Sequence, residues 1–199
     1  MPTRVINVGQ DESAVFLWET EGKSGKYAAL SYCWGDSRAI LKTTRENLGS
    51  NKASIELSLL PQTVRDAVEI TRRLNIPYLW VDALCIIQRD EEDWARESGN
   101  MCNCYSNAYL TISASRSSEA SEGCFGMQNL WGGPPHEFNY MGESVYTRVA
   151  KKNTYFHQEP EHLSDTSTEP INSRAWTLQE TLLSNRTVFY TSKELVWEC

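Results

Sequence analysis

The sequence lacks both a long apolar run and an excess of basic residues. None of its 199 residues falls in an uncharged apolar stretch of the length, about 20 residues, that a membrane-spanning helix needs. The N-terminus lacks the charged-then-apolar layout of a secretory signal. A net charge of −7 argues against binding to a nucleic-acid backbone, which requires a basic face. These absences predict an acidic, cytoplasmic, globular protein with neither a membrane nor a nucleic acid as its partner.

Several catalytic motifs are also absent. The chain has no Gly-x-Ser-x-Gly elbow, no phosphate-binding Gly-x-x-x-x-Gly-Lys loop and no Gly-x-Gly-x-x-Gly turn. All three histidines lie in the irregular stretch 116–170, away from Cys33 and Cys85. Cys102 and Cys104 have the wrong spacing for a zinc knuckle. The sequence therefore disfavours serine or cysteine hydrolases, kinases, ATPases and ordinary dehydrogenases, and it predicts free thiols without a metal site.

Alternating strand and helix patterns dominate the first 115 residues. Residue types and turn positions predict strands over 4–8, 14–19, 27–32 and 109–115, a further strand from Tyr78, and helices over 60–74 and about 91–106. The first helix should bury one stripe, formed by Leu60, Val64, Ala67, Val68, Thr71 and Leu74. On the second helix, one face should hold Trp94, Glu97 or Ser98, Met101 and Tyr105. This order predicts an α/β fold with a parallel sheet flanked by helices.

Residues 116–170 interrupt this pattern. They are rich in Ser, Gly, Pro and Glu, which is typical of an insertion or a functional lid, although a strand over 145–150 fits. A helix over 173–183, a strand over 187–191 and a final segment over 194–199 follow. We predict a single domain over 1–199, and an apolar last segment suggests that the natural chain continues.

Three apolar segments end in polar and aromatic clusters. They are YAALSYCWGD (27–36), YLWVDALCIIQ (78–88) and SRAWTLQE (173–180). The second holds Asp82 inside the most apolar run of the chain, where an unpaired carboxylate would cost several kcal/mol. Ligands of parallel α/β sheets bind at the carboxyl ends of the strands. We therefore predict that Asp82, Glu180, Trp34 and Trp176 line one crevice.

Each of these residues also has a plainer interpretation. Asp82 could cap a helix or accept buried backbone N–H groups, and Trp34 and Trp176 could be core residues. Glu180 could pair with Arg174 or Arg186 on an exposed helix face. Gln88 and Gln179 could satisfy backbone groups, and Ser31 and Tyr32 could simply end a strand. Composition and spacing alone leave the function open.

The three segments, in this order, resemble the heterokaryon-incompatibility (HET) domain of filamentous fungi. The matching blocks are YAALSYCWG (27–35), Leu60-Pro61 followed by YLWVDALCIIQ (78–88), and RAWTLQE (174–180). Further similarity lies in Trp94 to Tyr105, in NAYLTI (107–112) and in LSNR (183–186), so the resemblance covers residues 27–199. It implies a role in self/non-self recognition that triggers cell death when incompatible cells fuse.

A more distant resemblance links the HET domain to the TIR domain, a flavodoxin-like parallel sheet that in many members cleaves NAD. Leu30-Ser31-Tyr32 resembles the first TIR strand, and residues 173–180 resemble the segment that carries the TIR catalytic glutamate, with Thr177 in place of cysteine. The resemblance implies Glu180 as the catalytic residue and NAD as the substrate. The residues implied in NAD binding are Ser31, Tyr32, Trp34, Gly35, Asp82, Arg174 and Trp176.

The implied chemistry suits these residue types. Cleavage of the nicotinamide–ribose bond builds positive charge on the ribose, which one carboxylate can stabilise, and nicotinamide leaves as a neutral group. TIR-type sites are often completed by neighbouring subunits, so we expect homo-oligomers on activation. Two alternatives stay open: a non-catalytic signalling module that acts by self-assembly, and a domain that senses NAD or a related nucleotide without cleaving it.

Overall fold

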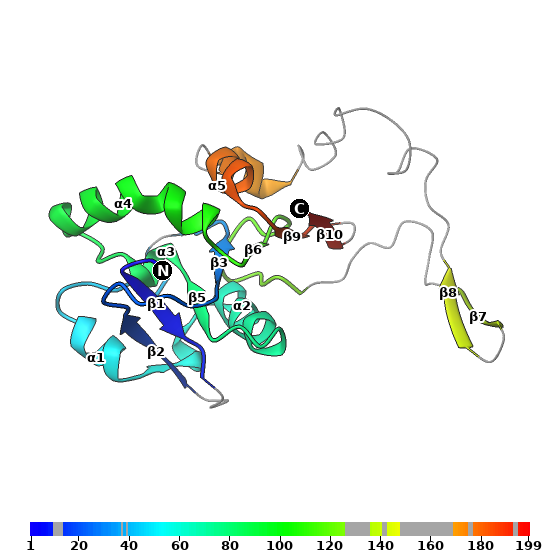
Figure 1. The fold of residues 1–199 in the computed structure, drawn as a ribbon, viewed down its shortest axis with the longest axis horizontal. Helices are drawn as coiled ribbons and strands as arrows, with labels where there is room; N and C mark the ends of the chain where they lie inside the picture. The colour runs from blue at the N-terminus through cyan, green and yellow to red at the C-terminus, as the bar shows by residue number, and fades with distance from the viewer. Residues whose placement is uncertain are drawn as a thin grey trace.

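The computed structural model describes residues 1–9, 14–36, 38, 40–125, 136–140, 143–147, 169–174, 177–192 and 195–199. Its main sheet has eight strands in the order β10-β9-β6-β3-β5-β1-β2-β4 (Figure 1). The strands are β1 Arg4–Asn7, β2 Ala14–Glu19, β3 Tyr27–Ser31, β4 Ile55–Glu56, β5 Tyr78–Trp80, β6 Leu110–Ser113, β9 Thr187–Tyr190 and β10 Leu195–Glu198. The helices are α1 Leu48–Ala53, α2 Gln62–Arg73, α3 Asp82–Cys85, α4 Glu91–Ser106 and α5 Thr177–Leu183, with 3-10 turns η1 Leu57–Leu59 and η3 Pro170–Ser173.

The sheet is mixed, with a parallel centre. β3 pairs in parallel with β5 on one side and with β6 on the other, and β6 pairs in parallel with β9. All other pairings are antiparallel. The predicted parallel sheet is therefore correct for the centre and wrong for the margins. The reason is connection length, because the short β1–β2 and β9–β10 links can only join antiparallel neighbours, whereas parallel pairs need a long crossover.

Helices cover both faces of the parallel centre. In Figure 1, α4 and α5 lie side by side above the strands and α2 lies below them. Between the layers, Trp80 and Tyr105 are buried and pack edge to face with ring centroids 5.5 Å apart. The apolar strands β3 and β6 are buried along their whole length, as expected for strands covered on both faces.

Helix α2 confirms the predicted helix at 60–74 to within two residues. Its C-terminal end is a Schellman motif, in which Asn75 has φ +54° and the N–H groups of Ile76 and Asn75 donate to the carbonyls of Thr71 and Arg72. The predicted stripe is buried from Leu60 to Thr71. Leu74 is the exception, with 51% of its surface exposed, because the helix ends one residue earlier.

Helix α4 has the predicted bounds, and three members of its predicted face lie toward the core: Glu97 and Tyr105 are buried and Met101 packs against the core. Trp94 is the exception, with 54% of its surface exposed, and Asp93, which the pattern did not assign to this face, is buried beside Glu97. The two acids occupy the buried face because Arg4 of β1 reaches them there: its Nη2 hydrogen-bonds Asp93 and lies 3.9 Å from Glu97. A distant cation thus overrides the apolar pattern of the helix.

The predicted insertion, 116–170, is attached to the domain near both of its ends. Near its start, the Asp66 carboxylate of α2 accepts the N–H groups of Cys124 and Phe125, at 2.7 and 3.2 Å. Near its end, the Glu169 carboxylate accepts the N–H and the hydroxyl of Ser192, at 3.0 and 2.7 Å. Between these anchors the structure describes one hairpin, β7 His136–Tyr140 with β8 Glu143–Thr147, which overlaps the predicted strand at 145–150.

The cysteines and the other predicted strands agree with the sequence predictions. None of the six cysteines, all of which lie among the described residues, forms a disulfide. The strands predicted at 4–8, 14–19, 27–32, 109–115 and 187–191 correspond to β1, β2, β3, β6 and β9, and the helix predicted at 173–183 begins later, at Thr177. Among the described residues, no helix is long and apolar enough to cross a membrane.

Candidate functional site

The candidate site lies at the carboxyl end of β3. Ser31 is the last residue of this strand, and Tyr32, Trp34 and Gly35 follow in an extended loop. Asp82 starts α3 directly after β5, the parallel neighbour of β3, so both segments end at the same edge of the sheet. Helix α5 brings Glu180 to the same edge. The chain places β5 on one side of β3 and then β6 on the other side. Ligands of open α/β sheets bind at such a point, where the strand order reverses.

Glu180 is buried at the centre of this cluster, with 2% of its surface exposed. The Ser31 hydroxyl donates a short hydrogen bond to Glu180 Oε2. On the other oxygen, Arg174 Nη2 lies 3.6 Å from Glu180 Oε1. The Ser31 bond joins residues 149 positions apart in the chain, at the end of β3 and the middle of α5.

Arg174 connects the two acids of the site. Its Nη1 donates to the Tyr32 carbonyl at 2.6 Å, which ties the segment before α5 to the end of β3. The charges of both Glu180 and Asp82 raise the pKa of Arg174, although burial acts in the opposite direction. One guanidinium is therefore the counter-ion of two carboxylates.

Both carboxyl groups hold their protons more tightly than usual. Burial raises the pKa of Glu180, and the Asp82 charge adds to this effect, while Arg174 and the Ser31 hydrogen bond oppose it. Burial likewise raises the pKa of Asp82, whose carboxylate is enclosed although part of the residue reaches solvent, and Arg174 opposes the shift. An acid whose pKa is raised toward neutrality suits proton transfer.

Asp82 has protein partners on both carboxylate oxygens. The indole N–H of Trp34 lies 3.1 Å from Oδ1 and 3.0 Å from Oδ2, and the Ala83 N–H donates to Oδ1 at 2.7 Å. The plainer interpretation of this residue, a carboxylate that accepts N–H groups, therefore describes its contacts. Asp82 holds the Trp34 loop in place, and Gln88 in turn donates to the backbone carbonyls of Asp82 and Ile86.

Trp34 is partly buried and fixed from two directions. Besides its bond to Asp82, its ring has Lys42 Nζ 5.2 Å from the centroid. This cation–π contact occupies one ring face, so a planar ligand would stack on the opposite face or displace the lysine.

Gly35 is required by the backbone at this point. It has φ +67°, and a Cβ placed there would lie 2.7 to 3.1 Å from atoms of Glu119. Any other residue would combine an unfavourable conformation with this close approach. Gly35 therefore shapes the loop that carries Trp34, and nothing in its geometry requires a ligand.

Two tyrosine hydroxyls in the cluster differ in their partners. Tyr105, which the sequence analysis assigned only to a helix face, donates to the Leu30 carbonyl at 3.2 Å. The Tyr32 hydroxyl is buried close to Asp82 but makes no hydrogen bond of acceptable geometry within the described part of the chain. Burial, followed by the charge of Asp82, raises the pKa of Tyr32 well above its usual value.

This difference makes a testable prediction about stability. We expect Tyr32→Phe to leave the free energy of unfolding unchanged or to raise it by up to about 1 kcal/mol, because it removes an unsatisfied buried polar group. Tyr105→Phe is the matched control and should lower the same free energy by about 1 kcal/mol, because it removes a made hydrogen bond. Urea denaturation of both variants checks this. A larger loss for Tyr32→Phe than for Tyr105→Phe would contradict the prediction.

One family model matches most of the chain. Residues 27–180 match the family described as Heterokaryon incompatibility protein (HET). The chain belongs to the HET family. Membership implies a role in heterokaryon incompatibility and in the cell death that accompanies it. The match begins at the first residue of β3 and ends at Glu180, so it includes every residue of the candidate site, whereas β1, β2, β9 and β10 lie outside it. Searches of curated proteins and of solved structures found no match.

The HET domain brings seven of the eight predicted site residues together. They are Ser31, Tyr32, Trp34, Gly35, Asp82, Arg174 and Glu180. The eighth, Trp176, lies outside the described residues. Lys42 and the Tyr105 hydroxyl were not predicted, because Lys42 belongs to no motif and the helical pattern placed Tyr105 on a face without indicating the partner of its hydroxyl. The roles of the eight residues in binding or catalysis stay predictions.

The raised pKa values predict how the stability of the HET domain depends on pH. A carboxyl group whose pKa is higher in the folded state stabilises the fold below its unfolded pKa, about 4.3 for Glu, and this contribution disappears as the pH rises through the folded pKa. Glu180→Gln cannot titrate. We therefore expect the wild-type advantage over Glu180→Gln in unfolding free energy to shrink from about pH 4 to about pH 7. Denaturant midpoints measured across this range test it, and an advantage that grows with pH would contradict it.

Proposed function

We propose that this HET domain triggers cell death by hydrolysing NAD to nicotinamide and ADP-ribose, with Glu180 as the catalytic carboxylate. The observation that carries the proposal is the position of Glu180: a buried acid at the carboxyl end of the central strand β3, bound by Ser31 and beside Arg174. An enclosed carboxylate interacts more strongly with a developing positive charge than an exposed one.

The strand order supports a TIR-like site. The four parallel strands follow one another along the chain as β3, β5, β6 and β9. In the sheet they lie in the order β5-β3-β6-β9, which is the order 2-1-3-4. The flavodoxin-like order begins in the same way, and its ligands bind beside the first and third strands. Here these strands are β3 and β6, and Ser31 pairs with Ser113 at their carboxyl ends.

In the proposed reaction, the bond between the nicotinamide nitrogen and the ribose C1′ breaks, and its electron pair leaves with neutral nicotinamide. Glu180 stabilises the positive charge that remains on the ribose. Water then adds to C1′ and gives its proton to Glu180, whose raised pKa favours the transfer. Ser31 orients the carboxylate, and Asp82 holds the Trp34 indole in place.

Access to Glu180 requires a rearrangement. The carboxylate is 2% exposed and both oxygens have protein partners, so the ribose hydroxyls must replace the contacts of Ser31 and Arg174. A site closed in this way fits an effector that is inactive until assembly or a partner moves α5.

The second candidate is a non-catalytic signalling module. The favouring observation is that the contacts of Asp82 and Glu180 are fully accounted for by Trp34, Ala83, Ser31 and Arg174, which is what a purely structural ion-pair cluster would show. In that case cell death would follow from self-assembly alone.

One experiment separates the two. The purified chain is incubated with NAD, both dilute and under crowding that favours assembly, and nicotinamide is measured by chromatography. Release above that of the Glu180→Gln variant supports hydrolysis. Calorimetric binding of NAD without nicotinamide release would indicate a nucleotide sensor, and neither binding nor release in either state would favour the non-catalytic module.

A further inference from the structure

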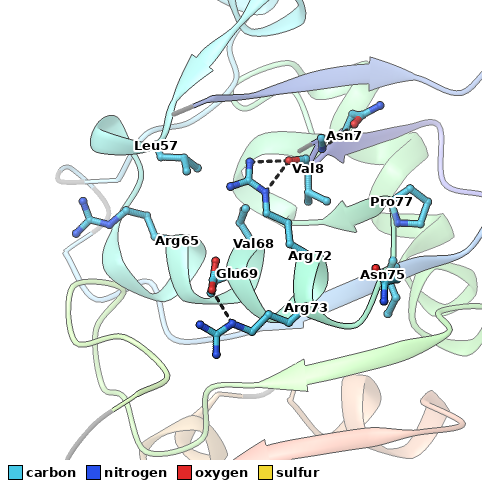
Figure 2. Close-up of a pocket in the computed structure, with 12 residues that line it drawn as sticks. Asn7, Val8, Leu57, Arg65, Val68, Glu69, Arg72, Arg73, Asn75 and Pro77 are labelled. Carbon is cyan, nitrogen blue, oxygen red and sulfur yellow. Dashed lines mark hydrogen bonds and ion pairs between the residues drawn. The ribbon is translucent and has the colours of Figure 1, made fainter. Parts of the chain in front are cut away.

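A second concave region lies at the opposite edge of the sheet from the candidate site. It has a volume of about 860 Å³ and is bordered by α2, by the end of β1 and by the turn that leads into β5 (Figure 2). Pro77 lines it just before β5, whereas Asp82 follows β5 at the other end. Strand β5 therefore separates the pocket from the Glu180 cluster, and the two are distinct.

The pocket has an apolar floor. The accessible part of this floor comes from the half-buried Leu57 at one side and the exposed Pro77 at the other (Figure 2), whereas Val8, Val68 and Ile76 each expose 3% or less of their surface. Pockets for small ligands commonly measure about 300–1,000 Å³ and combine such a floor with a few polar groups. The size and lining fit a ligand with one apolar or planar part.

The rim of the pocket is basic. Arg65, Arg72 and Arg73 line it, with Glu69 as the one acid among the described lining residues. The guanidinium of Arg72 donates hydrogen bonds to the carbonyls of Val8 and Ala14, which fix its side chain at the border of the pocket. Arg73 pairs with Glu69 at 2.6 Å, and Arg65 donates to Gln62 at 2.5 Å (Figure 2 shows Arg65 at the outer edge).

This concentration of positive charge contrasts with a chain whose net charge is −7. A plainer role exists for two of the arginines, since Arg72 and Arg73 form the last turn of α2, where cations offset the helix dipole. That role explains neither Arg65, two turns earlier, nor the hollow beside it. Guanidinium groups above an apolar floor are suited to a phosphate attached to an apolar or planar group.

We propose that this pocket binds a small phosphorylated ligand, with its apolar or planar part against Leu57 and Pro77 and its phosphate at the rim formed by Arg65 and Arg73. The site is independent of the proposed NAD hydrolysis, because it shares no residue with the Glu180 cluster.

Calorimetry with three probes tests the proposal: AMP, adenosine and inorganic phosphate. We expect AMP to bind at least about tenfold more tightly than either fragment, because only AMP engages both the floor and the rim. The double variant Arg65→Gln/Arg73→Gln should weaken AMP binding at least about tenfold. Lys23→Gln, which removes a cation that is 60% exposed near the opposite end of the β1–β2 hairpin, should leave it unchanged.

The outcomes are distinguishable from those of the proposed function. AMP binding that survives the double arginine variant but is lost in Glu180→Gln would place AMP at the other site and overturn the proposal. Equal binding of AMP and adenosine, no AMP binding at all, or binding of an acidic peptide in place of AMP would also overturn it. Circular dichroism of the variants shows that the fold is kept, and the single variants Arg65→Gln and Arg73→Gln provide the same test if the double variant is unstable.

Discussion

Glu180→Gln is expected to lower nicotinamide release from NAD by at least about 10²–10³-fold while the domain stays folded. The substitution preserves the size of the side chain and keeps an oxygen for the Ser31 hydroxyl, but it removes the negative charge that stabilises the ribose cation in the proposed reaction. Initial rates of nicotinamide release at saturating NAD measure the effect. The loss should appear in kcat, because charge stabilisation acts on the transition state.

A matched control is Glu21→Gln, in a turn far from the site, where the side chain is 77% exposed. It should change neither the rate nor the melting temperature. If Glu180→Gln keeps a rate within about threefold of wild type, Glu180 is not the catalytic residue. Loss of both activity and the circular dichroism spectrum would instead assign Glu180 to the fold.

Arg4→Met is expected to lower the free energy of unfolding by about 3–5 kcal/mol, because it leaves buried carboxylates without their buried partner. Arg4 is 4% exposed, hydrogen-bonds Asp93 and donates through Nε to the Cys85 carbonyl at 2.7 Å. It joins β1 to both α3 and α4. Arg96, the other cation at Asp93, has 57% of its side chain exposed and cannot replace a buried partner.

The control is Arg73→Met, which removes an exposed pair with Glu69 on α2 and should change the free energy by less than about 0.5 kcal/mol. Denaturant unfolding of both variants gives the comparison. A loss below about 1 kcal/mol for Arg4→Met would show that methionine packing offsets the broken ion pair, as happens at some buried sites.

The sequence alone was sufficient to predict those helices whose formation depends on residues close to one another in the chain. The period of apolar residues located α2. The structure shows the local groups that bound the helices: Asn75 with its positive φ follows α2, and Asp90 accepts the Asp93 N–H as the N-cap of α4. For the site, three apolar segments with polar ends were enough to predict that Trp34, Asp82 and Glu180 lie at one edge of the sheet, whereas Ser31 was implied only by the TIR resemblance.

Interactions across long distances in the chain were not predictable in this way. Arg4 and Asp93 are 89 residues apart, and only their pairing explains why acids rather than Trp94 occupy the buried face of α4. The hydrogen bond from Trp34 to Asp82 was not predictable either. Considered alone, each of the two residues is as compatible with a ligand-binding role as with a structural one. Residues 37–59 carry no clear period, and the short elements α1 and β4 formed there depend on packing against β2.

The carboxylates of Asp66 and Glu169 hold the chain at residues 124–125 and at residue 169, near the two ends of the long insertion. Backbone on either side is thereby fixed to the folded body, independently of what lies in between. The entropy cost of closing such a loop grows only with the logarithm of its length. Grafting a shorter or longer peptide between positions 125 and 169 should therefore leave Arg174 and Glu180 where they are, which makes this segment a natural place for an affinity tag or a fluorescent reporter.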